Sequence, residues 1–173
     1  MVYQGKTISL RTHHVTEPGG VRVVRDMIHH PGSAVILPVF PDGRILMIRQ
    51  YRLAALAAIW ELPAGTLDKG ETPLRAARRE LAEETGFRSA RWRKLGAFYP
   101  SPGLLAERMY LYLAQEIRPG TAHPEGDERI SVHSFSMTAL LGMIRAGEII
   151  DAKSLVGLLY WSRWGRQLAA DDK

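Results

Sequence analysis

The feature that most restricts the fold of this chain is a short segment that carries signals for both ends of one helix. Thr72 is a favourable N-cap residue, Pro73 suits the first helical position, and Gly86 is typical of the residue after a helix. A helix over 73–85 places the glutamates at 80, 83 and 84 on one face, because their spacing is i, i+3 and i+4. We therefore predict a helix that carries three neighbouring carboxylates.

Neighbouring carboxylates repel one another, so an ordinary solvated helix gains little from this spacing. A hard cation such as Mg²⁺ or Mn²⁺ removes the conflict, because it prefers oxygen ligands and also binds phosphates. Glycines at 65 and 86 permit sharp turns at both ends, which would bring the backbone carbonyl of Ala64 beside the carboxylates. For E-x-x-E-E alone, the simpler interpretation is a surface helix whose glutamates offset nearby arginines.

The composition is that of one globular domain: 173 residues, of which 46% are hydrophobic and 24% charged. Cysteine is absent, which excludes disulfides and thiolate metal sites. The N-terminus lacks the pattern of a secretory leader, and the longest mostly apolar run, 53–60, is too short to cross a bilayer. We therefore expect a cytoplasmic protein with no membrane partner.

Alternating and apolar runs on both sides of the helix predict short strands. Segments 7–15 and 21–28 flank a turn at 17–20, which indicates a hairpin. Segments 34–40 and 44–51 flank a turn at 41–43 and predict a second hairpin that is buried on both faces. Later strands are expected at 92–99, 109–116 and 130–136, and closing helices at 137–146 and 152–167.

The wider segment matches the pattern G-x5-E-x7-R-E-U-x-E-E-x-G-U, where U is apolar, from Gly65 to Phe87. This is the Nudix box, and the chain is identified as a member of the Nudix hydrolases. The resemblance implies an α/β (α+β) fold, with a mixed β-sheet sandwiched between helices and an N-terminal β-rich extension. We accordingly divide the chain into an extension, 1–32, that can serve dimerisation, and a Nudix domain, 33–173.

By the same resemblance, Glu80, Glu83, Glu84 and the Ala64 carbonyl would bind Mg²⁺ or Mn²⁺. Arg79 and Glu71 would pair and hold the segment together. The implied reaction is attack of metal-activated water on one phosphorus of a diphosphate.

Flanking motifs resemble the ADP-ribose pyrophosphatase branch of the family: the segments 49–52, 60–65 and 99–103, with Pro102 sixteen residues after Gly86. This branch cleaves ADP-ribose or related nucleoside diphosphate sugars to AMP, or another nucleoside monophosphate, and a sugar phosphate. The resemblance places Arg25 and Arg52 at the diphosphate or near the base, often across a homodimer interface. Ser101 and Glu107 would lie near the terminal ribose, with Pro102 and Gly103 in the same loop. Without the resemblance, Arg25 would be interpreted as a solvated charge.

The resemblance also implies a general base on the loop before a late strand, which reads 124–130 here. Relatives often carry a second glutamate two residues before Glu128, but this chain has Gly126 there and its nearest carboxylate is Glu125. The base assignment is therefore divided among Glu128, which is preferred, Glu125 and Glu83.

Two alternatives remain open. The substrate can be another nucleoside diphosphate derivative, such as GDP-mannose, a dinucleotide or an oxidised nucleoside triphosphate, or the chain can be a binding or regulatory protein with a Nudix shell. The net charge of +5 and the basic stretch 88–94 permit polyanion binding, but a solvated rim beside an acidic metal site explains that stretch equally well. We expect a small-molecule nucleotide and a second copy of the chain as partners, and no nucleic acid.

Overall fold

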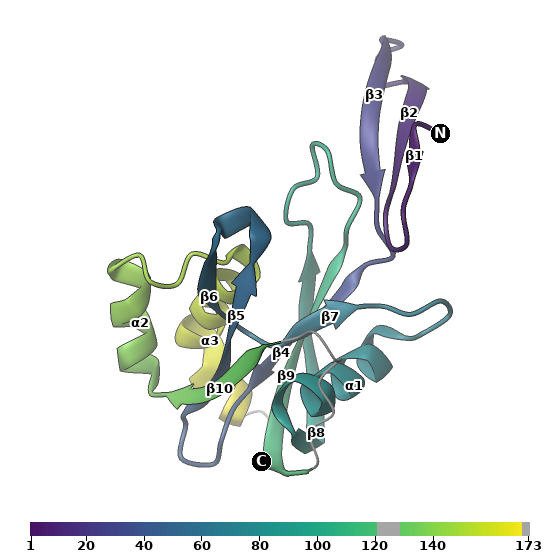
Figure 1. Cartoon of the computed structure of the whole chain (residues 1–173). Helices are drawn as coiled ribbons and strands as arrows, with labels where there is room; N and C mark the ends of the chain where they lie inside the picture. Colours follow the sequence, from purple (N-terminus) through teal and green to yellow (C-terminus); the bar gives the residue numbers. More distant parts are fainter. Residues whose placement is uncertain (121–128, 171–173) are drawn as a thin grey trace.

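The computed structural model describes residues 1–120 and 129–170, apart from the side chains of 166 and 168–170. Strands form three sheets in this part of the chain, in the orders β1-β2-β3, β10-β5-β6 and β7-β4-β9-β8, and three helices pack around the last two (Figure 1). Among the described residues, no helix has the length and hydrophobicity that a membrane span requires. The elements are β1 (Tyr3–Gln4), β2 (Ser9–Thr16), β3 (Arg22–His29), β4 (Ser33–Pro38), β5 (Ile45–Arg52), η1 (Leu53–Ala55), β6 (Ala57–Glu61), β7 (Ala64–Thr66), α1 (Pro73–Thr85), β8 (Phe87–Phe98), β9 (Met109–Pro119), β10 (Ile130–Phe135), α2 (Met137–Arg145) and α3 (Ala152–Ala170).

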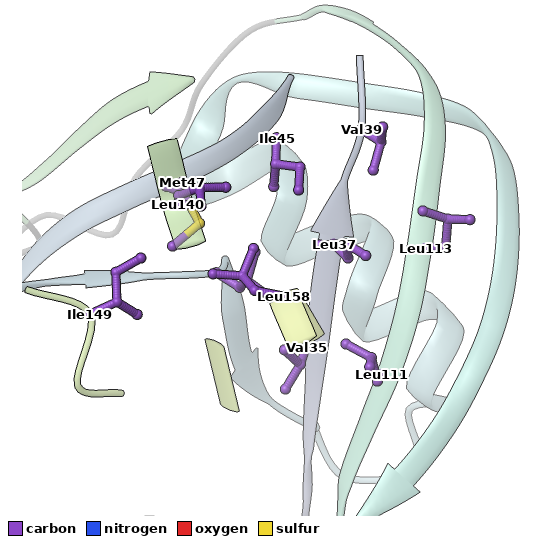
Figure 2. Packing of buried hydrophobic residues seen from close by; sticks show 11 residues of the cluster. Val35, Leu37, Val39, Ile45, Met47, Leu111, Leu113, Leu140, Ile149 and Leu158 are labelled. Carbon is purple, nitrogen blue, oxygen red and sulfur yellow. The ribbon is translucent and has the colours of Figure 1, made fainter. Parts of the chain in front are cut away.

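The central sheet is mixed, because β4 runs parallel to β9 and antiparallel to β7. Ala34 and Ile36 of β4 pack with α1 on one face. Val35 and Leu37 point to the other face and pack with residues of α2 and α3, including Leu158, as Figure 2 shows. Helices on both faces explain why β4 is apolar along its whole length, and the predicted sandwich is confirmed.

The predicted second hairpin is wrong. β4 and β5 follow one another along the chain, but β4 pairs with β7 and β9, whereas β5 pairs with β6 and β10. A single isolated bridge, between Val39 and Ile45, remains between the two segments. Each strand is central in its own sheet, so continuous hydrophobicity indicates burial but does not identify the neighbouring strand. The short strands β6 and β7 were not predicted.

Helix α1 has the predicted ends. The Thr72 hydroxyl accepts a hydrogen bond from the backbone N–H of Arg75 at 3.4 Å, and Pro73 occupies the first helical position. Gly86 follows with a φ of 72°, a conformation that glycine adopts without strain. Strand β8 then begins at Phe87, five residues earlier than predicted, so the acidic helix passes directly into the central sheet.

The β1-β2-β3 sheet extends away from the rest of the molecule (Figure 1). It confirms the predicted N-terminal hairpin, with Glu17 N–H bonded to the Val21 carbonyl across the turn. Apolar side chains remain exposed along this sheet: Val2, Tyr3, Ile8, Val15, Val21 and Val24. Hydrogen bonds from Ile28 N–H to Leu104 O and from Ala106 N–H to Ile28 O join its base to the loop before β9.

Candidate active site

A cleft of about 450 Å³ opens at the ends of β4 and β7, beside α1. Its lining is strongly charged, and the charges come from separate parts of the chain. The acidic lining residues are Asp68, Glu80, Glu83 and Glu107, and the basic ones are Lys6, Arg52, Arg79 and Lys153.

Helix α1 forms one wall, which we call the carboxylate wall: Arg79, Glu80, Glu83 and Glu84. The side chain of Glu80 is 12% exposed and that of Glu83 is 30% exposed, and both line the cleft. Glu84 is buried and accepts a hydrogen bond from the backbone N–H of Ala64 at 2.9 Å. The helix therefore brings the three predicted carboxylates to the segment that contains Ala64.

Arg79 organises the carboxylate wall. Its Nε and Nη2 donate to the two carboxylate oxygens of Glu71 at 3.2 and 3.0 Å, and Nη2 also donates to the Thr66 carbonyl. These bonds raise the pKa of the Arg79 guanidinium above its usual value and lower that of the Glu71 carboxyl. The predicted pairing of Arg79 with Glu71 is confirmed, and it ties the loop before α1 to the helix.

Gly65 is required by a close approach of Glu80. A Cβ atom at position 65 would lie 1.9 Å from the Glu80 carboxyl carbon, so no other residue fits without displacing that side chain. The backbone of β7 therefore lies directly against one of the predicted metal ligands.

The carboxylate wall has the chemistry of a hard-cation site. The Arg79 Nη1 atom donates to Glu80 at 2.7 Å and to Glu83 at 3.0 Å, so two carboxylates already converge on one cationic nitrogen. Within the described residues, no three Asp, Glu or His side chains are grouped as a complete ligand set. The donors are all oxygen, which suits a divalent ion of the Mg²⁺ type, and Glu84 would need to turn toward Glu80 and Glu83 to share it.

The other wall, which we call the cationic wall, consists of Arg52, Lys153 and the carboxylate between them, Glu61. Arg52 donates to both oxygens of Glu61 at 2.7 and 2.6 Å, and the Lys153 Nζ donates to Glu61 at 2.9 Å. Burial acts to raise the pKa of Glu61, which is 1% exposed, but the bonds from both cations outweigh it and the pKa is lowered. Glu61 is therefore an anion that holds two cations at the cleft.

A third group joins β4 to the loop before β9. The Ser33 hydroxyl donates to Glu107 Oε1 at 2.5 Å, and both residues are buried at the cleft. His30 Nδ1 lies 3.6 Å from the same oxygen and accepts a hydrogen bond from the N–H of Gly32.

The predicted site residues divide into three groups. Ala64, Glu80, Glu83, Arg52 and Glu107 line the cleft, and Glu84 lies directly behind it. Four others do not reach the cleft of their own chain: Arg25 is 54% exposed and paired with Glu17 on the N-terminal sheet, and Ser101, Pro102 and Gly103 lie in an exposed loop. Glu125 and Glu128 lie outside the described residues.

Sequence reasoning missed several cleft residues. Lys6 and Thr7 reach the cleft from the turn between β1 and β2, and Lys153 reaches it from the first turn of α3. Lys153 had a local signal, since a lysine is electrostatically unfavourable near a helix N-terminus and therefore indicates a special role. The turn at 5–8 carries no such signal, because its place at the cleft depends on how the whole N-terminal sheet folds back.

Comparisons with known proteins identify the family to which this chain is similar. The model of the NUDIX domain matches residues 29–155. An ADP-ribose pyrophosphatase of Bacillus subtilis (strain 168) is 35% identical over 161 residues, which cover 92% of this chain and 87% of the relative. A methanol dehydrogenase activator of Bacillus methanolicus is 31% identical with the same coverage. An ADP-ribose pyrophosphatase of Mycobacterium tuberculosis (strain ATCC 25618 / H37Rv) is 34% identical over 91% of this chain and 78% of its own length.

A solved structure described as an ADP compounds hydrolase superimposes with a TM-score of 0.82 over 96% of this chain and 91% of that chain. Its sequence identity is 20%, so this likeness concerns the fold.

Proposed function

This chain belongs to the Nudix family of hydrolases, and from that premise we propose that it cleaves the diphosphate bond of ADP-ribose or a related nucleoside diphosphate sugar. The products would be AMP, or another nucleoside monophosphate, and a sugar phosphate. The observation that carries the proposal is one cleft with a carboxylate wall and a cationic wall, of the kind that a metal ion and a diphosphate would share. The similarity to two ADP-ribose pyrophosphatases supports the choice of substrate.

Members of this family use a divalent metal ion, and we propose Mg²⁺ or Mn²⁺, held by Glu80, Glu83, Glu84 and the Ala64 carbonyl. When bound, such an ion supplies positive charge to the diphosphate oxygens. Glu80 and Glu83 already converge on Arg79 Nη1, which supports the assignment. Arg79 holds these two carboxylates in fixed orientations, while its bonds to Glu71 hold the preceding loop in place.

The other proposed roles follow the substrate along the cleft. Arg52 would contact the diphosphate, because its guanidinium is fixed by Glu61 yet 40% exposed toward the cleft. Glu107 would accept from hydroxyls of the terminal ribose, with its carboxylate held by Ser33. Ser101, Pro102 and Gly103 would complete this subsite from the adjoining loop.

The general base remains a proposal among Glu83, Glu125 and Glu128. Glu83 lines the cleft, whereas the other two lie outside the described residues. Replacing each by Gln and recording the pH dependence of kcat separates them, because the acidic limb of the profile disappears when the base is lost.

A substrate panel tests the proposed function. ADP-ribose, GDP-mannose, a diadenosine diphosphate and an oxidised nucleoside triphosphate are incubated with enzyme and Mg²⁺, and products are identified by ³¹P NMR. We expect ADP-ribose to be converted fastest, to AMP and ribose phosphate. Faster conversion of another compound would identify that compound as the substrate in place of ADP-ribose. If the protein hydrolyses no compound of the panel, the binding or regulatory alternative is favoured.

We also propose that the chain is a homodimer in which residues 1–32 act as the dimerisation extension of a Nudix domain at 33–173. The β1-β2-β3 sheet leaves apolar side chains exposed, and exposed apolar surface of this kind supports contact with a partner. Arg25 pairs with Glu17 and does not line the cleft of its own chain, so it would then serve the partner's site. Light scattering of the whole chain and of the variant Val24→Glu tests this: a dimer that survives V24E, or a monomeric whole chain, contradicts the proposal.

We place the enzyme in the cytoplasm, because its proposed substrates carry charges that prevent them from crossing membranes unaided. Fractionation of producing cells tests this placement, and recovery outside the cytoplasm contradicts it.

A further inference from the structure

Lys153 is a charged residue at the cleft that the proposed mechanism has not used. It occupies the second position of α3, and its side chain is 9% exposed. The Nζ atom donates to Glu61 at 2.9 Å and to Asp151 at 3.0 Å. Asp151 in turn accepts from the backbone N–H and the hydroxyl of Ser154, which fixes the start of the helix.

The location of Lys153 is unfavourable for stability. A helix N-terminus carries partial positive charge, so an ammonium in the first turn is repelled by the helix dipole. Burial adds a desolvation cost that ion pairs in proteins often fail to recover, and an apolar side chain of similar size is commonly as stable. Glu61 is already paired with both nitrogens of the Arg52 fork and does not need a second cation to be compensated. The ion pairs of Lys153 with Glu61 and Asp151 offset these costs, so fold stability alone gives no preference for this lysine over an apolar side chain.

The Lys153 side chain lines the cleft, where its ammonium has donor capacity for an anion. Lysine has three N–H donors, and among the described residues two acceptors, Glu61 and Asp151, contact it. Lys153 lines the cleft together with Arg52, and the Glu61 carboxylate joins the two cations from behind. The elements β5, β6 and α3 lie on the opposite side of β4 from α1 (Figure 1), and Arg52 and Lys153 line the same cleft as Glu80 and Glu83.

We propose that Lys153 is a substrate-binding residue, which donates to a non-bridging oxygen of the diphosphate beside Arg52, and that Glu61 is a positioning residue for both cations. The proposal rests on the proposed function, because it takes the diphosphate as the anion. Two cations on one buried carboxylate keep a fixed separation, so they can hold both phosphates of the substrate in one orientation relative to the carboxylate wall.

Calorimetric titration with α,β-methylene ADP-ribose, which resists hydrolysis, tests the proposal in the presence of Mg²⁺. We expect Lys153→Met to weaken binding on the order of tenfold, the usual scale for a lost hydrogen bond to a charged group. Lys153→Arg should retain most of the wild-type affinity for the analogue. Lys94→Met is the matched control, because Lys94 is exposed on β8 outside the cleft, and should bind as the wild type does. Unchanged affinity in Lys153→Met overturns the proposal.

A double-mutant cycle with Arg52 distinguishes direct contact of Lys153 with the diphosphate from an indirect role in which Lys153 only positions Arg52. If Lys153 contacts the diphosphate, adding Lys153→Met to Arg52→Met weakens analogue binding further and lowers the salt dependence of the dissociation constant. If Lys153 acts through Arg52 alone, the double variant binds as Arg52→Met does, and the substrate-binding assignment is wrong. Thermal unfolding of each variant shows whether it is folded.

Failure of the proposed function can be distinguished from failure of the Lys153 proposal. If wild-type protein hydrolyses no compound of the panel, titration with inorganic pyrophosphate replaces the analogue. Pyrophosphate affinity that falls on the order of tenfold in Lys153→Met supports the anion site even then, and equal affinity rejects it.

Discussion

The two walls of the cleft are both held by ion pairs, but they are assembled over different distances along the chain. In the carboxylate wall, the ion pairs and hydrogen bonds of Arg79 reach partners at most 13 residues away, from the Thr66 carbonyl to Glu83. In the cationic wall, Lys153 and Glu61 are 92 residues apart. The first wall is fixed by one helix and its preceding loop, whereas the second exists only when β5, β6 and α3 have packed. The two walls should therefore respond differently to substitution and to acid.

The largest effect is expected in the carboxylate wall. Glu83→Gln keeps the shape of the side chain and removes one charge, so kcat for ADP-ribose should fall about 10³-fold, the scale of losing one preorganised electrostatic group. Thermal unfolding should change little, because Glu83 is partly exposed. Glu148→Gln, in the exposed segment between α2 and α3, is the control. Activity of Glu83→Gln close to that of the control contradicts the metal-site assignment.

The next largest effect is expected from disturbing the contact between the β7 backbone and the Glu80 carboxyl. Gly65→Ala places a methyl group against the Glu80 carboxyl and should displace it, so activity should fall about 10²-fold, as when a supporting contact of a metal ligand is lost. Gly142→Ala in α2 is matched, because a Cβ there meets nothing within 4 Å. If steady-state assays show equal activity for both variants, the contact between β7 and Glu80 has no catalytic role.

A smaller effect is expected where a long-range contact supports a substrate group. Ser33 and Glu107 are 74 residues apart, and Ser33→Ala removes the hydroxyl that holds the Glu107 carboxylate. KM for ADP-ribose should rise about fivefold, the scale of one hydrogen bond, with kcat nearly constant. A fall in kcat without a change in KM would show that Glu107 serves the reaction and not the binding of ribose.

The smallest effect is on stability in acid. The pKa values of Glu61 and Glu71 are lowered in the folded chain, so each contributes stability that is present above the unfolded pKa of about 4.3. That contribution is lost as the pH falls through the lower folded values, because the unfolded chain then binds more protons. Thermal unfolding from pH 6 downward should show a steeper loss in wild type than in Glu71→Gln. Identical slopes would contradict the assigned shift of Glu71.

The same difference in chain distance explains which parts could be predicted from the sequence. Helix α1, its caps and the Arg79–Glu71 pair depend on residues within one short segment, so their spacing contains the necessary information. The order of the strands in the sheets depends on residues far apart in the chain, which is why the predicted pairing of β4 with β5 is wrong. Ser33 was missed for the same reason, since it gains its role from Glu107, 74 residues along the chain. For Lys153, the local signal at the helix N-terminus indicates a special residue but not its partner Glu61, 92 residues away.

The resemblance to a family added residues that spacing alone could not indicate. It placed Arg52 and Glu107 at the cleft, and the structure brings both there. It also names Arg25, which is a solvated residue paired with Glu17 in this chain. The role that we propose for Arg25 requires a second chain, and a single sequence does not state how two copies would meet.

The central claim is that the carboxylate wall binds a divalent cation together with a diphosphate. Mn²⁺ binding followed by electron paramagnetic resonance, with and without α,β-methylene ADP-ribose, tests it most directly. We predict that the analogue tightens Mn²⁺ binding by at least about tenfold in the wild type, because ion and ligand share the site. The variant Glu80→Gln/Glu83→Gln/Glu84→Gln should lose both the binding and the coupling. Equal Mn²⁺ affinity in the two proteins, with the analogue present, would contradict the claim.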